Sequence, residues 1–70
     1  MDNLHNKKVK INTNRILDRK LNYNPLFVKF ITDNKDTIFT AMLEENHTET
    51  YNLKEEPIWL FHKDDLIEVK

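Results

Sequence analysis

The chain has 70 residues, 39% of them apolar and 33% charged, with 11 Lys and Arg against 12 Asp and Glu. This length provides one small domain, and a domain of this size buries only about 60% of the surface that its unfolded chain exposes. The absence of cysteine excludes disulfides and thiolate zinc sites, and the absence of glycine and serine excludes glycine-rich phosphate loops and serine nucleophiles.

The sequence contains no apolar run close to the roughly 20 residues of a membrane span. No hydrophobic stretch of the kind found in signal peptides follows the charges of its first eight residues. We therefore expect a cytoplasmic protein without a membrane partner. The single domain is expected to span 1–70, with residues 1–6 as a segment that can be flexible.

Alternation of apolar and polar residues over 7–12 predicts the first strand, with Val9 and Ile11 on one face. The next residues, 13–25, include spacings that suit one or two helical turns, but asparagines and then Pro25 stop any continuation. We expect a long loop there that contains a turn or a short helix.

Two runs dense in β-branched and aromatic residues, 26–32 and 37–43, predict strands. The turn formers at 33–36 lie between them, so this part of the chain predicts a hairpin. A second turn at 44–47 leads to 48–53, where apolar residues alternate again. These three strands predict a meander.

The tail predicts a strand at 57–62, a tight turn at 63–65 and a short closing strand at 66–69. Pro57 has no backbone N–H to donate, so it belongs at the start of its strand or on a sheet edge. Five or six short strands in so short a chain predict an all-β fold, an antiparallel barrel that hides its strand edges.

The segment Trp59–Val69 resembles the end of Src-homology-3-like barrels, where an aromatic strand, one tight helical turn and a short aliphatic strand close the barrel. The strand at 9–12 and the long loop after it are similar to the start of that family. The resemblance implies a small five- or six-stranded barrel with a long early loop and a short helical turn before the last strand. Members that bind proline-rich peptides use clustered loop aromatics and a proline in the last turn. This chain has only Tyr23 in the loop and Lys63-Asp64-Asp65 in the turn, so we do not expect it to bind such peptides.

Nine Asn, nine Lys and six Ile indicate an AT-rich genome. The small size, this composition and the lack of catalytic equipment resemble the accessory proteins of phages that infect low-GC Gram-positive bacteria. The resemblance implies a phage or mobile-element protein that acts in the host cytoplasm, where it modulates or inhibits a host or defence-system protein.

Charge is divided unevenly, because residues 1–35 hold eight basic and three acidic side chains and residues 36–70 hold three and nine. The basic half, with Arg15, Arg19 and Lys20, predicts contacts to phosphates, and a tyrosine in its loop is available to stack on a base. A competing interpretation is that the two halves pair within the sheet and neutralise each other. The net charge of −1 favours this second interpretation, since nucleic-acid-binding domains are usually strongly basic.

The acidic half predicts a different role, because the carboxylate pairs at 55–56 and 64–65 could occupy a basic groove on a partner. His62 beside Asp64 and Asp65 is the only compact group with metal-ligand chemistry, but adjacent Asp residues on a turn more often form or cap the turn. Consecutive carboxylates on a strand point to opposite faces, so they do not form an acid–base pair. We expect no catalytic residue, no cofactor and no metal site.

As strands, 26–31 and 57–62 carry bulky apolar side chains on both faces, of which a single-layer barrel buries one. Exposed apolar patches on small proteins mark contact with another chain. We therefore expect a non-enzymatic protein-binding module, with self-association into a dimer as one form and a nucleic-acid-binding barrel as the alternative. The candidate binding residues are Tyr23, Phe27, Trp59, Arg15, Arg19, Lys20, Glu55, Glu56, Asp64 and Asp65.

Overall fold

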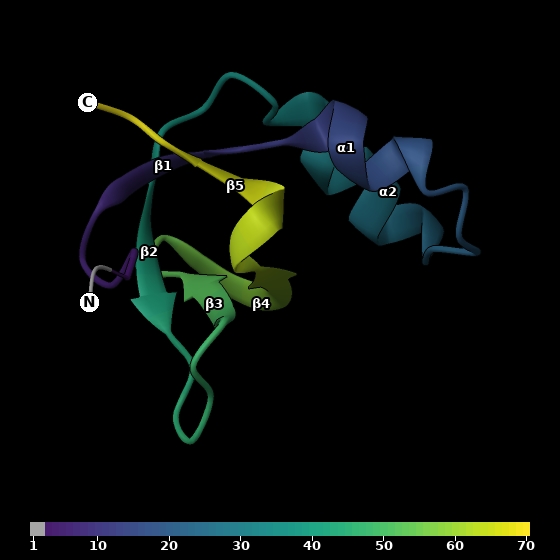
Figure 1. The fold of residues 1–70 in the computed structure, drawn as a ribbon. Coiled ribbons are helices and arrows are strands. Elements are labelled where there is room, and N and C mark those ends of the chain that lie inside the picture. The colour runs from purple at the N-terminus through teal and green to yellow at the C-terminus, as the bar shows by residue number, and fades with distance from the viewer. Residues whose placement is uncertain (1–2) are drawn as a thin grey trace.

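The computed structural model describes residues 3–70 and shows one five-stranded antiparallel sheet with two helices that lie together beside it (Figure 1). The elements in chain order are β1 (Lys8–Ile11), α1 (Thr13–Asp18), α2 (Pro25–Asp33), β2 (Phe39–Leu43), β3 (Thr50–Leu53), β4 (Glu56–His62), the 3-10 helix η1 (Lys63–Asp65) and β5 (Leu66–Glu68). The strand order is β4-β3-β2-β1-β5. The all-β prediction is confirmed only in part, because two helices accompany the antiparallel sheet. The sheet does not close into the expected barrel, because β4 and β5 remain its two edges.

The expected first strand is confirmed as β1, and its alternation explains its position in the sheet. Val9 and Ile11 are buried, whereas the lysines between and before them are not. β1 pairs with β2 on one side, where Val9 lies opposite Phe39, and with β5 on the other, where Ile11 lies opposite Leu66. The first strand of the chain is thus paired with the last one.

The expected strand at 26–32 is wrong, because this segment forms the helix α2. The side chain of Asn24 caps the helix by accepting a hydrogen bond from the N–H of Leu26 at 2.9 Å, and Pro25 fills the first turn, where its missing N–H costs nothing. Phe27 and Ile31, four residues apart, then face the core together. The predicted hairpin turn at 33–36 is wrong for the same reason, because Asp33 ends α2 and the residues after it connect this helix to β2.

The short helix expected within 13–25 is confirmed as α1, which the side chain of Asn12 caps by accepting from the N–H of Arg15. Two further contacts hold this helix in place. The buried hydroxyl of Thr13 donates a hydrogen bond to the carbonyl oxygen of Ile31 at 2.8 Å, so α1 is joined to α2. Ile16 is buried in the core of the domain.

The predicted meander is only partly right: its second and third strands are β2 and β3, and the meander continues into β4. The β3–β4 pairing is irregular, because Tyr51 lies opposite Phe61 whereas Leu53 lies opposite Glu56. Residues 57–60 therefore form a bulge opposite a single residue of β3. The predicted helical turn and closing strand are confirmed as η1 and β5.

The core lies between the inner face of the sheet and the two helices. Eight of its buried side chains come from the strands, and one comes from each helix. These residues are Val9, Ile11, Ile16, Ile31, Phe39, Ala41, Tyr51, Leu53, Phe61 and Leu66. Helix packing therefore completes a core that the open sheet alone does not enclose.

The cap of α2 gives a test of the helix that replaces the expected strand. We expect Asn24→Ala to lower the free energy of unfolding by about 1 kcal/mol, because one helical N–H loses its acceptor. Urea denaturation followed by circular dichroism measures this loss. The matched control is Asn22→Ala, which changes an exposed loop residue two positions earlier. Equal destabilisation by the two substitutions would contradict the capping role.

Candidate binding site

Three of the predicted aromatic residues meet where α2 packs on β4. The Phe27 ring lies 5.5 Å from the Tyr23 ring, 5.4 Å from the Trp59 ring and 5.7 Å from the Phe61 ring, measured between centroids. Such distances are typical of stabilising aromatic pairs. We call these four residues the aromatic seam, and it joins the start of α2 to the bulge of β4.

The seam is more buried than a binding surface of exposed rings would be. Phe61 is buried, and Tyr23, Phe27 and Trp59 are half-buried. The Tyr23 hydroxyl is buried and has no hydrogen-bond partner among residues 3–70. The aromatic rings of the seam therefore serve mainly to attach the helix to the sheet.

Three aliphatic side chains that neighbour the seam in sequence are exposed. Leu26, Ile58 and Leu60 are 67%, 69% and 56% exposed. Leu26 precedes Phe27 on α2, and the other two flank Trp59 on the β4 bulge. We call Leu26, Ile58 and Leu60 the apolar rim.

Four predicted charged residues come together in a second cluster, which pairs the two halves of the chain. The guanidinium of Arg19 contacts the carboxylate of Asp65, and this hydrogen bond raises the pKa of Arg19. Arg15 lies 3.6 Å from Asp65 and 3.9 Å from Asp64. Asp65 is buried, so the cluster ties η1 to α1. The opposite charges of the halves are adjacent here.

His62 lies near only one of the two adjacent carboxylates, because its Nδ1 is 3.5 Å from the carboxylate of Asp64. Its Nδ1 accepts a hydrogen bond from the N–H of Asp64, and its Nε2 lies 3.2 Å from Glu49, whereas Asp65 is bound to Arg19. Within the described residues 3–70, no group of three or more His, Asp and Glu side chains could hold a metal ion.

The remaining predicted residues lie apart from both clusters. Lys20 is exposed and follows α1 in a left-handed conformation, and Glu56 is exposed at the start of β4. Glu55 instead binds the backbone N–H and the hydroxyl of Thr40, each at 2.8 Å, and the same hydroxyl accepts from Lys8. These hydrogen bonds to Thr40 lower the pKa of Glu55. Glu55 therefore attaches the β3–β4 turn to β2, and we call this contact the Glu55 clip.

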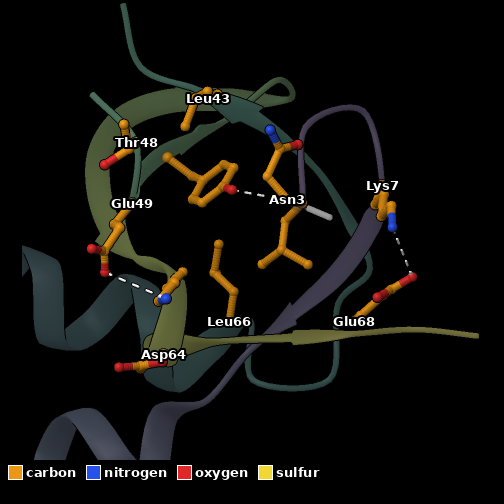
Figure 2. A pocket seen from close by; sticks show the side chains of 11 residues that line it. Asn3, Lys7, Leu43, Thr48, Glu49, Asp64, Leu66 and Glu68 are labelled. Carbon is orange, nitrogen blue, oxygen red and sulfur yellow. Dashed lines mark hydrogen bonds and ion pairs between the residues drawn. The ribbon is translucent and has the colours of Figure 1, made fainter. Parts of the chain in front are cut away.

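Sequence reasoning missed a half-open groove of about 650 Å³, shown in Figure 2. Leu4, Leu43, Tyr51 and Leu66 form its apolar floor. Lys7 pairs with Glu68 at 3.8 Å, and Lys63 pairs with Glu49 at 3.5 Å, so two ion pairs lie at the edge of the groove (Figure 2). Its floor comes from four separate segments, so no local pattern could indicate it.

Comparison of the chain with protein families, with curated proteins and with solved structures found no match. None of the helices within residues 3–70 has the combination of length and apolar character that crossing a membrane requires. The candidate site therefore rests on the geometry of this chain alone.

The Glu55 clip predicts a pH-dependent loss of stability. A carboxylate with a lowered pKa contributes stability that is fully present above the ordinary glutamate value of about 4.3 and is lost as the pH falls through the lowered value. We expect Glu55→Gln to cost about 1 kcal/mol at pH 7, because the clip is solvent-exposed. The difference from wild type should shrink as the pH falls below about 4.

Urea denaturation at several pH values measures this effect. The neighbouring substitution Glu56→Gln is the control, since Glu56 makes no corresponding hydrogen bonds to Thr40. A cost for Glu55→Gln that stayed constant down to pH 3 would show that the charge of the clip is unimportant.

Proposed function

We propose that the domain is a non-enzymatic protein-binding module and that the apolar rim is its contact surface. The observation that carries the proposal is the exposure of Leu26, Ile58 and Leu60, each of which is next in sequence to a ring of the aromatic seam. Burying a large aliphatic side chain contributes about 1.5–3 kcal/mol, so a partner that covers three of them gains substantially. Exposed apolar surface on a small domain is typical of an interaction site.

The bulge at 57–60 favours contact through side chains. A regular edge strand presents free N–H and C=O groups to an added strand, and a bulge interrupts this row. It also turns Ile58 and Leu60 outward while Trp59 packs on Phe27. A complementary apolar surface on the partner therefore fits this site better than an added strand does.

The alternative of nucleic-acid binding has less support. Arg15 and Arg19 face Asp64 and Asp65, so part of the basic half is neutralised within the fold. The Tyr23 ring packs on Phe27 and is only half exposed for stacking on a base. Both facts weaken the features on which this alternative depends.

We also propose that the fold is Src-homology-3-like and that the protein is a phage or mobile-element accessory factor that modulates or inhibits a host or defence-system protein. The strand order β4-β3-β2-β1-β5 and the single helical turn before β5 support the first part. The composition and small size support the second. In this role, occupation of a partner surface is sufficient and no catalytic group is needed.

Substitution of one rim residue tests the proposed surface. We expect the tagged wild-type protein either to retain a specific partner from a low-GC Gram-positive lysate or to form a dimer in light scattering. Leu60→Asp should weaken that association at least tenfold, because a charge enters the apolar contact.

Ile67→Asp is the matched control, because Ile67 is also exposed but lies on β5 outside the apolar rim. Circular dichroism of each variant verifies folding. Association that Leu60→Asp and Ile67→Asp affect equally, or a monomer that retains no protein, would contradict the proposal. A retarded band in a low-salt gel shift would favour the nucleic-acid alternative.

A further inference from the structure

The two edge strands of the open sheet differ in how their edges are protected. An edge strand presents N–H and C=O groups to any added strand, and prolines and bulges are common ways to block this pairing. β4 has both, because Pro57 lacks an N–H and the register of β4 shifts against β3. β5 has neither, since it pairs with β1 in regular register over its whole length. Within residues 3–70, no strand pairs with the other side of β5.

The hydrogen bonds of β5 show which of its backbone groups face this other side. The N–H of Val69 donates to the carbonyl oxygen of Lys8 at 2.8 Å, and the N–H of Asn12 donates to the carbonyl oxygen of Asp65 at 2.8 Å. In an antiparallel ladder, the residues between those that bond to one neighbour direct their groups to the opposite side. We call these outward groups the free edge, and they include the C=O of Leu66, the N–H and C=O of Glu68 and the N–H of Lys70.

The side chains of β5 also suit a neighbouring strand. Ile67 and Val69 share one face of β5, because side chains alternate along a strand, and Leu66 on the other face lies in the core. Ile67 is 49% exposed and Val69 is half-buried. Ile67 lies outside the apolar rim, so that surface does not account for its exposure. A strand added at the free edge would cover both aliphatic side chains.

The N-terminal turn, residues 3–6, is attached to other strands. The N–H of Leu4 donates to the Tyr51 hydroxyl at 2.9 Å, and the N–H of Asn6 donates to the carbonyl oxygen of Ala41 at 2.7 Å. Tyr51 lies on β3 and Ala41 on β2, so these bonds do not use the free edge of β5. The expectation of flexibility at 1–6 covers this turn and also residues 1–2, which lie outside the described residues.

We propose that the free edge pairs with the free edge of a second copy of this chain, antiparallel and across a two-fold axis beside Glu68. In this register the two copies of Glu68 exchange two hydrogen bonds. The C=O of each Leu66 accepts from the N–H of Lys70 of the other copy, which adds two more. Ile67 then lies opposite Val69 of the second copy, in the closely spaced type of antiparallel pair.

The neighbouring registers are less favourable. A shift of two residues in one direction pairs Leu66 with Glu68 of the second copy and loses two hydrogen bonds, because the N–H of Leu66 already donates to the carbonyl oxygen of Lys63. A shift in the other direction leaves Ile67 without an opposite residue among 66–70. The register centred on Glu68 is therefore the one that uses the backbone groups and also covers Ile67.

The charges beside the two-fold axis permit this pairing. Two Glu68 carboxylates opposite each other repel, but each lies 3.8 Å from Lys7 of its own chain (Figure 2). Lys70 of the second copy occupies the diagonal position on the same face, which long side chains reach across a strand pair. Each carboxylate is thus flanked by two lysines, one from each copy.

Pairing through β5 adds to the proposed function and does not compete with it. β4 and β5 are opposite ends of the strand order, so the dimer leaves the apolar rim of both copies available to a partner. A partner with two binding sites would then gain avidity from the dimer. The edge has five residues, whereas a standard interface uses roughly 20–30 residues a side, so the dimer should dissociate on dilution.

Sedimentation equilibrium over a concentration series up to the millimolar range measures the dimer. Glu68→Pro removes the N–H that faces the second copy and keeps the β1–β5 ladder, because this N–H does not bond to β1. The matched control is Glu68→Ala, which also loses the carboxylate but retains the N–H. We expect the dissociation constant of Glu68→Pro to be at least tenfold higher than that of Glu68→Ala.

A monomer at every concentration of wild type, or equal dissociation constants for the two Glu68 variants, would overturn the pairing. Circular dichroism verifies the folding of both. A measurement on wild type needs no variant: in a mixture of isotope-labelled and unlabelled protein, filtered NOEs report contacts between copies alone. We expect them between the methyl groups of Ile67 and Val69, and their absence from a populated dimer would refute the register.

Two further variants separate this dimer from association through the apolar rim. Ile67→Asp should raise the dissociation constant of the β5 dimer at least tenfold, because a charge enters the Ile67–Val69 contact, and Leu60→Asp should leave it unchanged. Association through the apolar rim has the reverse pattern. A dimer that Leu60→Asp weakens and Ile67→Asp leaves intact would place self-association on the apolar rim and overturn the pairing through β5.

Discussion

The packing of α2 on the sheet is the interaction on which the rest of the structure depends. A sheet that stays open leaves its inner face uncovered, and a chain of 70 residues has few side chains with which to cover it. α2 provides this cover at two points, where Phe27 meets Trp59 and Phe61 on β4 and where Phe30 meets Phe39 on β2. The residues of the apolar rim are sequence neighbours of Phe27 and Trp59, which make this contact.

Charge pairing fixes the other helix, α1, and brings opposite charges from the two halves of the chain together. Asp65, the last residue of η1, is buried and binds Arg19, while Arg15 lies close to the same carboxylate. Buried carboxylates are tolerated when a guanidinium pairs with them, and removal of one partner leaves the other unpaired. The pairing of Arg15 and Arg19 with Asp64 and Asp65 therefore attaches α1 to η1 and neutralises part of the charge contrast between the two halves of the chain.

Strand prediction succeeded where residues alternate and failed where composition and periodicity disagreed. Val9 and Ile11 alternate with lysines, and this pattern is typical of a strand that is buried on one face. The residues from Leu26 to Ile31 have the composition of a strand, but Asn24 and Pro25 before them form a helix start, and the spacing of Phe27 and Ile31 is helical. Tyr23 and Trp59 could be chosen as candidates because they are large aromatics. Their meeting through Phe27, like the assembly of the groove, depends on tertiary contacts that no local pattern encodes.

The apolar rim and the groove differ in how the fold holds their residues. The groove is lined by Leu4 of the N-terminal turn, which hydrogen bonds to Tyr51, Ala41 and Leu43 attach to the sheet. Leu26, Ile58 and Leu60 are already exposed, so contact with the apolar rim requires only the removal of water. The apolar rim is therefore a surface that a partner can cover while the rest of the fold stays as it is.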